Sequence, residues 1–355
     1  MNALRRFLIQ LTAAGNVVAA LMLLGCGLSS RLNPAEYPFA AVLGLCFPLV
    51  LALNAAFLVV WIVFCVRYVW LPVVGMAVSW PYIFSYCPLN LSKDVPEGAI
   101  KLLTYNVRSL DAEGVNAEGL SLWEYLAGSE ADIVCLQECG TRKAAEFDSL
   151  MSAMGYPCIV KPKNKQSLAV YSRFPLVSVR TVAYESTSNG SLAAEVLYEG
   201  DTVLVVNNHL ESYKLSVDDK EKYRGIIKEP EGEGTEEAAR TIVQKISEAS
   251  RIRGPQADSV LCFAEGTGRE AMIICGDFNE SPISYTCHRM GEKLTSAFRQ
   301  SGRGFGFSYN EKGFYFRIDH VFISDYWRSY GTYIDKTALW SDHYPLITYL
   351  QKAKN

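Results

Sequence analysis

Charged residues are distributed so unevenly along this chain of 355 residues that its two parts suit different solvents. Residues 1–92 carry five charged side chains, four basic and one acidic, whereas residues 93–355 carry all the others and have a formal net charge of -6. About a quarter of the second part is charged, which is the usual share in a globular domain. This pattern excludes a fully soluble protein, a disordered chain and a strongly basic nucleic-acid binder.

The first part, residues 1–92, contains three apolar runs that are free or nearly free of charge, at about 7–28, 39–66 and 68–89. A bilayer core about 30 Å thick needs roughly 20 apolar residues per helix, and each run is long enough. Pro72, Pro81 and Pro88 lie in or at the end of the third run, where neighbouring helices can satisfy the carbonyls that proline frees. The sequence therefore predicts a transmembrane region of three helices.

The basic residues next to these runs predict their orientation. If all three runs cross, Arg5, Arg6 and Arg67 lie on one side of the membrane and Arg31 on the other. Basic residues favour the cytoplasmic side, so we expect a cytoplasmic N-terminus and an extracytoplasmic second part. A cleaved signal segment is the alternative, because residues 23–26 loosely resemble a lipoprotein-processing site. Two further spans downstream favour an uncleaved anchor.

Residues 93–99 are polar, contain Pro96 and Gly98, and read as a linker to a globular domain over residues 100–355. In this domain short β-like runs alternate with helix-like stretches, of which Thr235–Ala264 is the longest. Because the strands and helices do not alternate strictly as β-α-β units, the pattern predicts a layered α/β sandwich. The expected strands are Ile100–Tyr105, Asp132–Leu136, Leu168–Tyr171, Leu192–Tyr198, Thr202–Asn207, Ala271–Cys275, Ile318–Ile323 and Leu346–Tyr349.

Polar side chains cluster at the ends of these strands. Any one of them could be an ordinary turn residue, but a sandwich brings such ends together at one edge. Carboxylates, amides and imidazoles without cysteine suit a hard divalent cation, Mg²⁺ or Mn²⁺, and this chemistry serves phosphoester hydrolysis. The segments concerned are Thr104–Asn106, Leu136–Glu138, Asn208–Ser212, Gly276–Asn279, Arg317–His320 and Ser341–His343.

In this order the six segments resemble the endonuclease/exonuclease/phosphatase superfamily, which includes pancreatic deoxyribonuclease, abasic-site endonucleases, neutral sphingomyelinases and inositol polyphosphate 5-phosphatases. The resemblance runs from about residue 100 to residue 350. It implies an α/β fold, a four-layer sandwich of two mixed β-sheets flanked by helices, and a hydrolase acting on ester bonds, a phosphoesterase or nuclease. The membrane-anchored layout resembles versions found in bacteria of the Bacteroides group, which would place the chain in a bacterial inner membrane.

The resemblance also implies a metal set. Glu138 would be the principal ligand of the ion, with Asn106 and Asp342 close to it. Arg108 stands where the abasic-site branch has an acidic residue, which argues against the metal arrangement of that branch.

Five further residues receive catalytic roles from the same resemblance. Asp277 would orient or deprotonate the attacking water, and Asn279 would hold the water and the phosphate. His343 would stabilise the phosphate, with Asp319 holding its tautomer. His209 would bind phosphate or act as a general acid. Outside this set, His320 is expected to be a structural or rim residue, and His288 matches no motif.

The sequence leaves the phosphoester open between nucleic acid, phospholipid and small phosphoesters. Nucleic acid is possible but is not favoured by the net charge, although Arg142, Lys143, Lys161, Lys163 and Lys165 could form a local basic patch. A solvated loop is the plainer interpretation of residues 161–165. The alternative function is a catalytically inactive, membrane-anchored module of the same fold that binds a phosphorylated ligand. The sequence contains no indication of oligomeric state.

Overall fold

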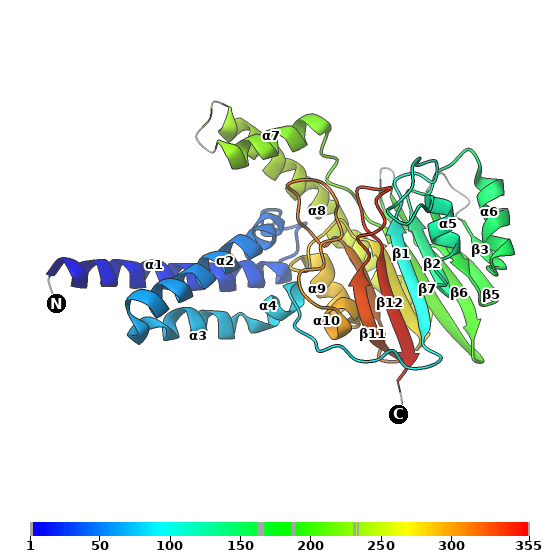
Figure 1. Cartoon of the computed structure of the whole chain (residues 1–355), viewed down its shortest axis with the longest axis horizontal. Coiled ribbons are helices and arrows are strands. Elements are labelled where there is room, and N and C mark those ends of the chain that lie inside the picture. Colours follow the sequence, from blue (N-terminus) through cyan, green and yellow to red (C-terminus); the bar gives the residue numbers. More distant parts are fainter. Residues whose placement is uncertain (1–2, 162–166, 187–188, 230–231, 233, 354–355) are drawn as a thin grey trace.

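The computed structural model of the chain describes residues 3–161, 167–186, 189–229, 232 and 234–353. Apolar N-terminal helices lie side by side and extend away from a domain built on two β-sheets (Figure 1). A linker without helix or strand connects the two parts.

The N-terminal part contains two helices that are long and apolar enough to cross a membrane, α1 (Ala3–Leu28) and α2 (Ala40–Phe64). The number rises to three if a bent pair, α3 (Trp70–Val78) and α4 (Trp80–Tyr86), counts as one span. Short 3-10 turns at Ser29–Arg31 and Val66–Tyr68 flank α2.

The predicted third span, residues 68–89, is therefore not one straight helix. The chain bends by 68° between α3 and α4, at Ser79. Pro81 lies in the first turn of α4, where its missing N–H costs nothing but prevents continuation of the preceding helix. The hydropathy of the run does not reveal this break, because residues 68–89 contain no charged side chain on either side of it.

Polar groups inside the helix bundle are paired across it. The Asn54 amide nitrogen donates to the carbonyls of Ala19 and Val50, at 2.9 Å each. The Trp61 indole nitrogen donates to Asn16 Oδ1 at 3.0 Å. Hydrogen bonds of this kind hold α1 against α2, where apolar contacts distinguish poorly between helix and lipid.

The second part forms two six-stranded mixed sheets with the orders β11-β12-β1-β2-β4-β3 and β5-β6-β7-β8-β10-β9. In each sheet two central strands run parallel, β1 beside β2 and β7 beside β8, and the other pairs are antiparallel. The strands of the first sheet are β1 (Ile100–Asn106), β2 (Ile133–Gln137), β3 (Cys158–Val160), β4 (Leu168–Ser172), β11 (Trp327–Ile334) and β12 (Leu346–Lys352). Those of the second are β5 (Leu176–Thr181), β6 (Gly190–Tyr198), β7 (Asp201–His209), β8 (Met272–Asp277), β9 (Thr295–Ser296) and β10 (Asp319–Ile323).

Three apolar clusters define the layers. The largest lies between the sheets and joins residues such as Leu102, Cys135 and Val205. A second packs α5 (Leu122–Ala127) and α6 (Ala144–Ala153) on the outer face of the first sheet. A third packs α8 (Thr235–Gly266) and α9 (Tyr285–Gly291) on the outer face of the second sheet. The prediction of two mixed sheets flanked by helices is confirmed; the short helix α10 (Ala297–Ser301) lies beside β9–β11.

One pair of helices leaves the sandwich. The C-terminal half of α8 covers the second sheet, but its N-terminal half and α7 (Val217–Lys228) project on the side of the membrane helices (Figure 1). We call this projection, residues 217–228 and 235–250, the arm. α8 contacts α2, so the arm lies close to the N-terminal helices.

The membrane helices are docked onto the domain and are not merely tethered to it. The Arg317 guanidinium donates to the carbonyls of Ser85 and Tyr86, at 2.7 and 3.3 Å. The Asn90 amide donates to the carbonyl of Gly302 at 2.8 Å. Ile283 of the domain is buried in one cluster with Leu23, Phe47 and Tyr86. These contacts set the position of the helices relative to the site.

Candidate active site

The strand ends that carry polar residues meet at one edge of the sandwich. Within the second sheet, Asp277 is paired with His209 on one side and with Asp319 on the other. The Asn106 amide, from the end of β1 in the first sheet, donates to Asp277 Oδ2 at 3.0 Å. Asn106 and Asp277, which are 171 positions apart in the sequence, therefore meet in one site.

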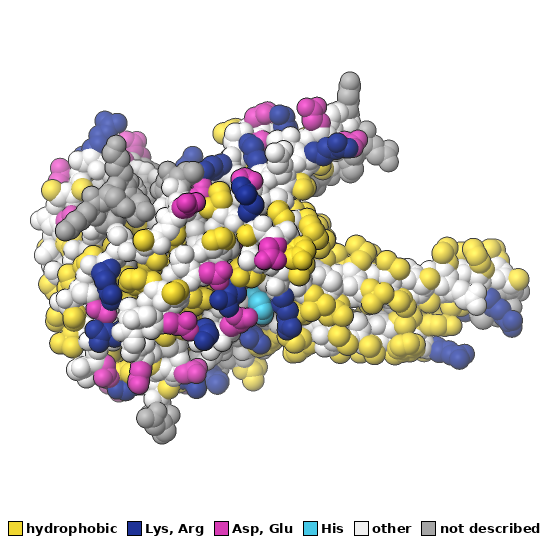
Figure 2. Space-filling model, turned by 180° about the vertical axis from the view of Figure 1, so that it is seen from behind, with side chains coloured by type: hydrophobic (Ala, Val, Ile, Leu, Met, Phe, Trp, Pro, Cys, Tyr) yellow, Lys and Arg dark blue, Asp and Glu magenta, His cyan; other side chains and the backbone are white. Residues whose placement is uncertain are grey.

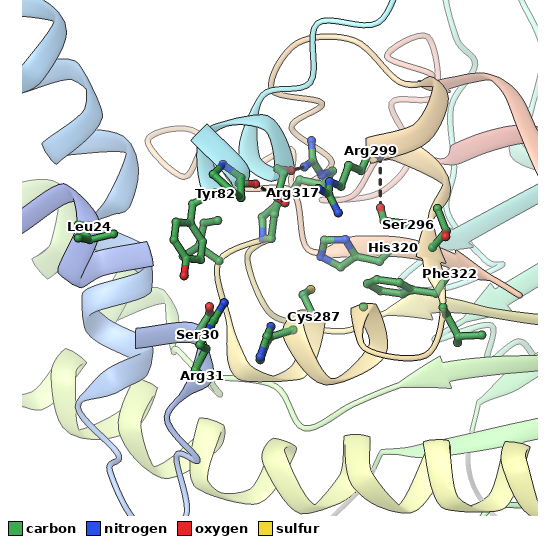
Figure 3. Close-up of a pocket in the computed structure, with 18 of the residues that line it drawn as sticks. Leu24, Ser30, Arg31, Tyr82, Cys287, Ser296, Arg299, Arg317, His320 and Phe322 are labelled. Carbon is green, nitrogen blue, oxygen red and sulfur yellow. Dashed lines mark hydrogen bonds between the residues drawn. The ribbon is translucent and has the colours of Figure 1, made fainter. Parts of the chain in front are cut away.

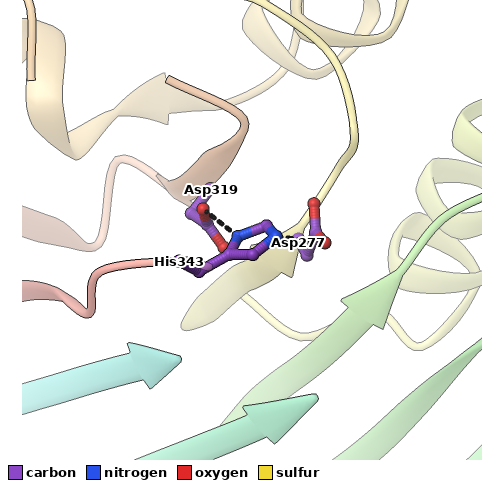
Figure 4. Close-up of side chains that lie close together, drawn as sticks. All are labelled: Asp277, Asp319 and His343. Atoms are coloured by element: carbon purple, nitrogen blue, oxygen red, sulfur yellow. Dashed lines mark hydrogen bonds and ion pairs between the residues drawn. The ribbon is translucent and has the colours of Figure 1, made fainter. Parts of the chain in front are cut away.

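At the centre of this site an imidazole lies between two buried carboxylates (Figure 4). His343 Nδ1 is 2.9 Å from Asp319 Oδ2, and His343 Nε2 is 3.7 Å from Asp277 Oδ2. All three side chains are at least nine-tenths buried. Burial opposes the charge of His343, but Asp319 and Asp277 outweigh it and raise the pKa of the ring to about 10.

A second group lies beside this trio. Asn106 Nδ2 donates to Glu138 Oε1 at 3.0 Å, the same distance as to Asp277. His209 Nε2 is 3.6 Å from Glu138 Oε1 and 3.7 Å from Asp277 Oδ2. Asn106 and Asp277 are buried, whereas Glu138 is half-exposed and opens into a cavity of about 500 Å³. Asp342 and Asn279 line the same cavity.

The backbone at these strand ends is unusual. Glu138 and Asn279 both have φ of 51°, a left-handed conformation that costs non-glycine residues of order 1 kcal/mol and is concentrated at functional sites. The Asn279 N–H donates to Asp277 Oδ1 at 2.8 Å, and its amide donates to the carbonyl of Leu210 at 3.1 Å. Gly276 has φ of 126°, and a Cβ there would lie 2.0 Å from the carbonyl oxygen of Asn208, so only glycine fits before Asp277.

The donor set suits a hard divalent cation. Glu138, Asp277, Asp319 and Asp342 place four carboxylates around two imidazoles, and burial raises the pKa of Asp277. Such an excess of acids favours a bound cation. The compact trio Asp277, Asp319 and His343 has ligand atoms within 4.8 Å of one another, but all three side chains are buried and His343 Nδ1 is already paired with Asp319. Glu138, at the open cavity, is the better anchor for an ion.

Asn106 differs from its predicted place beside an ion in one respect. Its amide nitrogen faces the two carboxylates, while its Oδ1 accepts the N–H of Arg108 at 3.0 Å. In this arrangement the amide nitrogen of Asn106 lies between the carboxylates of Glu138 and Asp277 and donates to both. The Asn106 amide would have to flip before its oxygen could bind a metal ion.

Two residues of the site have no counterpart in the sequence motifs. The Tyr309 ring lies edge-on to His343, with 5.2 Å between ring centroids, and Lys220 Nζ donates to the Tyr309 hydroxyl at 2.7 Å. Lys220 comes from α7 of the arm. Its helix carries a sequence signal, because Ser216 and Asp219 form a capping box at its N-terminus.

The two remaining histidines lie elsewhere. They line a second cavity of about 460 Å³ between the membrane helices and the domain, with Arg31, Arg299 and Arg317 (Figure 3). His320 is buried, and its Nε2 is 2.8 Å from the carbonyl of Glu280. Burial and Arg317 lower the pKa of His320 to about 3, so the ring stays neutral.

The described residues of the basic patch considered from the sequence do not line the catalytic cavity. Lys161 is paired with Asp148 at 2.6 Å, and Arg142 and Lys143 do not line the cavity within the described residues. Lys163 and Lys165 lie outside the residues that the structure describes.

Buried carboxylates on both sides of an imidazole, at the mouth of a cavity with further acids, define an acid–base hydrolytic site. Residues 103–343 match the model of the endonuclease/exonuclease/phosphatase family, and the chain belongs to this family. The protein is therefore a hydrolase acting on phosphoester bonds, as the resemblance of its motifs implies. Residues 6–86 match a second family model, described as a domain of unknown function. No match to a curated protein was found.

Solved structures share the fold. The catalytic domain of human nocturnin, with a bound sulfate anion, has a TM-score of 0.51 and 17% identity over 74% of this chain and 96% of that one. A 3′ phosphatase from Neisseria bound to a product DNA hairpin has a TM-score of 0.49 and 18% identity, over 70% and 98%. An endonuclease/exonuclease/phosphatase from Beutenbergia cavernae has 0.48 and 16%, over 72% of each chain. At 17% identity the likeness to the nocturnin domain shows the fold alone.

Proposed function

We propose that the chain is a membrane-anchored phosphoesterase that depends on Mg²⁺ or Mn²⁺ and hydrolyses a phosphodiester or phosphomonoester by attack of water. The observation that carries the proposal is the position of Asp277, which lies within 3.7 Å of both His209 and His343. Glu138, with Asp342 and Asn106 beside it, would hold the ion. When bound, the ion would neutralise phosphate oxygens and the developing charge on the leaving oxygen.

We assign phosphate binding and the proton transfers to individual side chains. The His343 cation, held by Asp319, binds a phosphate oxygen and stabilises the charge that develops on it. Asp277 accepts the proton of the attacking water, and Asn279 orients the water and the phosphate. His209 gives a proton to the leaving oxygen. Water thus adds across the P–O bond, and the products are an alcohol and a phosphate group.

The proposal is tested with the full chain in detergent on bis(4-nitrophenyl) phosphate and 4-nitrophenyl phosphate. We expect hydrolysis of at least one ester with Mg²⁺ or Mn²⁺, loss of hydrolysis with EDTA, and a loss of 100-fold or more in Asp277→Asn. Asp325→Asn, at an exposed acid outside the cavity, is the matched control. Inactivity on both esters, with binding of phosphate unchanged by Asp277→Asn, would support the inactive binding module.

We also propose that the chain is an integral protein of a bacterial inner membrane with its domain outside the cytoplasm. Basic side chains gather at the end of the helix bundle away from the domain (Figure 2), which is the expected cytoplasmic side. A C-terminal alkaline phosphatase fusion should be active, and a cytoplasmic reporter at the same place inactive. The reverse result would overturn the orientation.

A further inference from the structure

The catalytic cavity has one polar wall and two apolar walls. The polar wall is the site itself, with Glu138, Asp277 and His343. Facing it are side chains of the membrane helix α2 and of the arm, together with Phe314 and Phe316 from the loop before β10. The α2 and arm residues are Val42, Leu45, Leu49, Tyr223, Ala239, Ile242 and Ile246.

A direct backbone contact fixes the position of α2 relative to the segment that follows Asn279. A Cβ at Gly44 would lie 2.1 Å from the carbonyl oxygen of Ile283, so the helix backbone touches the domain directly. Ile283 is four residues beyond Asn279 and is buried in the cluster that joins the two parts. The contact is therefore part of the folded structure of the site.

The cavity opens toward the lipid-facing surface of α2. Leu45 is half-buried in the cavity, whereas Leu49, one turn further along the helix, is 72% exposed and also lines it. Figure 2 shows hydrophobic side chains where the arm meets the membrane helices. Apolar side chains therefore extend from the exposed face of α2 at Leu49 to the cavity that holds the catalytic residues.

A basic group marks the polar end of this surface. Lys220 reaches from the arm to Tyr309, whose ring lies against His343. The same arm thus carries apolar side chains that face α2 and, near His343, the Lys220 ammonium, which also pairs with Glu311 at 3.4 Å. This distribution matches a molecule with a phosphate at one end and a hydrocarbon tail at the other.

We propose that the substrate is an amphiphilic phosphoester, a lipid of the surrounding bilayer. Its phosphate lies between Glu138 and His343, and its tail lies between α2 and α8. Apolar walls favour such a tail by about 25 cal/mol per Å² removed from water, whereas a water-soluble phosphoester would leave them exposed. This inference rests on the proposed phosphoesterase function.

The test uses the full chain in mixed detergent micelles with two diesters that differ in tail length. These are 4-nitrophenyl methyl phosphate and 4-nitrophenyl hexadecyl phosphate, which release the same nitrophenol. Faster turnover of the hexadecyl ester is not decisive, because enzyme and ester share the micelle and their effective concentration is high. The decisive quantity is the ratio of kcat/KM for the two esters in variants of the apolar walls.

Ala239→Trp and Leu45→Trp place a large ring in the path of the tail and should lower the hexadecyl-to-methyl ratio at least tenfold. The matched controls are Ala238→Trp and Leu43→Trp, neighbours on the same helices that do not line the cavity, and these should keep the wild-type ratio. An unchanged ratio in both wall variants would overturn the inference while leaving the phosphoesterase intact. Failure of the wild type on both esters would instead count against the proposed function.

If a wall variant loses activity on both esters, it gives no kcat/KM ratio. The affinity for a lipid-like ligand is then measured instead. Radiolabelled hexadecyl phosphonate, which is not hydrolysed, should bind the wild-type chain and both control variants. It should bind Ala239→Trp and Leu45→Trp at least tenfold more weakly. Wild-type affinity in both wall variants would contradict a tail site between α2 and α8.

Discussion

Replacement of His343 by alanine is expected to lower kcat about 100- to 1,000-fold at any metal concentration. The ring is a buried cation between Asp319 and Asp277, and a preorganised donor to developing charge is worth roughly 3–4 kcal/mol. Because the proposed ligands of the ion are Glu138, Asn106 and Asp342 and not His343, the concentration of Mg²⁺ at half-maximal activity should stay the same. Activity as a function of metal concentration measures both quantities.

Two other variants separate the roles within the site. Glu138→Ala should raise the Mg²⁺ concentration needed for half-maximal activity, and excess metal should restore part of the rate. Asp319→Asn should resemble a milder His343→Ala, because it removes the group that orients the imidazole. A shift in the metal requirement of Asp319→Asn as large as that of Glu138→Ala would identify Asp319 as a ligand and contradict this assignment.

Arg253→Met is expected to lower the free energy of unfolding by about 3–5 kcal/mol, the usual cost of leaving a buried ion without its partner. Arg253 is fully buried and bonds Glu280 Oε1 at 2.9 Å. It also donates to the carbonyl of Glu211 and to Ser250, which ties the segment after His209 to the segment after Asn279. For a domain of this size the loss corresponds to a fall of roughly 6–20 °C in Tm.

Thermal unfolding of the full chain in detergent is the measurement. The control is Arg251→Met, which removes an exposed pair with Glu248 on the same helix and should change stability by less than about 0.5 kcal/mol. Adding Glu280→Gln to Arg253→Met should recover part of the loss, because the stranded carboxylate is then neutral. Equal Tm values for Arg253→Met and Arg251→Met would show that the buried pair does not stabilise the fold.

The sequence predicts the strands whose own residues form a short apolar run. Ile100–Tyr105 and Ala271–Cys275 are apolar because both faces of these central strands are buried. β5 is not among the expected strands, although Val177, Val179 and Thr181 are β-branched; it lies at the edge of the second sheet and most of its side chains are exposed. Helix α7 was missed because it is mostly polar; its capping box at Ser216 and Asp219 was the available signal.

The candidate residues depend on the tertiary structure in a different way. Motifs in the sequence name the groups, such as Asn106, Asp277 and His343, but not their distances. The structure brings them within hydrogen-bond range or a little beyond it, because the parallel pairs β1–β2 and β7–β8 end at the same edge of two packed sheets. Lys220 and Tyr309 carry no motif, and their place at the site follows from the packing of the arm.

The sequence by itself determined that the chain has an apolar N-terminal part, an α/β phosphoesterase domain and the chemical groups of its site. Hydropathy, strand periodicity and the residues of each motif are local properties, read over a few residues at a time, and the order of the motifs is read directly along the chain. Only the tertiary structure decided that the third apolar run bends at Ser79, that His343 lies between Asp319 and Asp277, and that α2 forms a wall of the catalytic cavity. These three features depend on backbone geometry and on contacts between distant segments, which apolar composition and motif order do not specify.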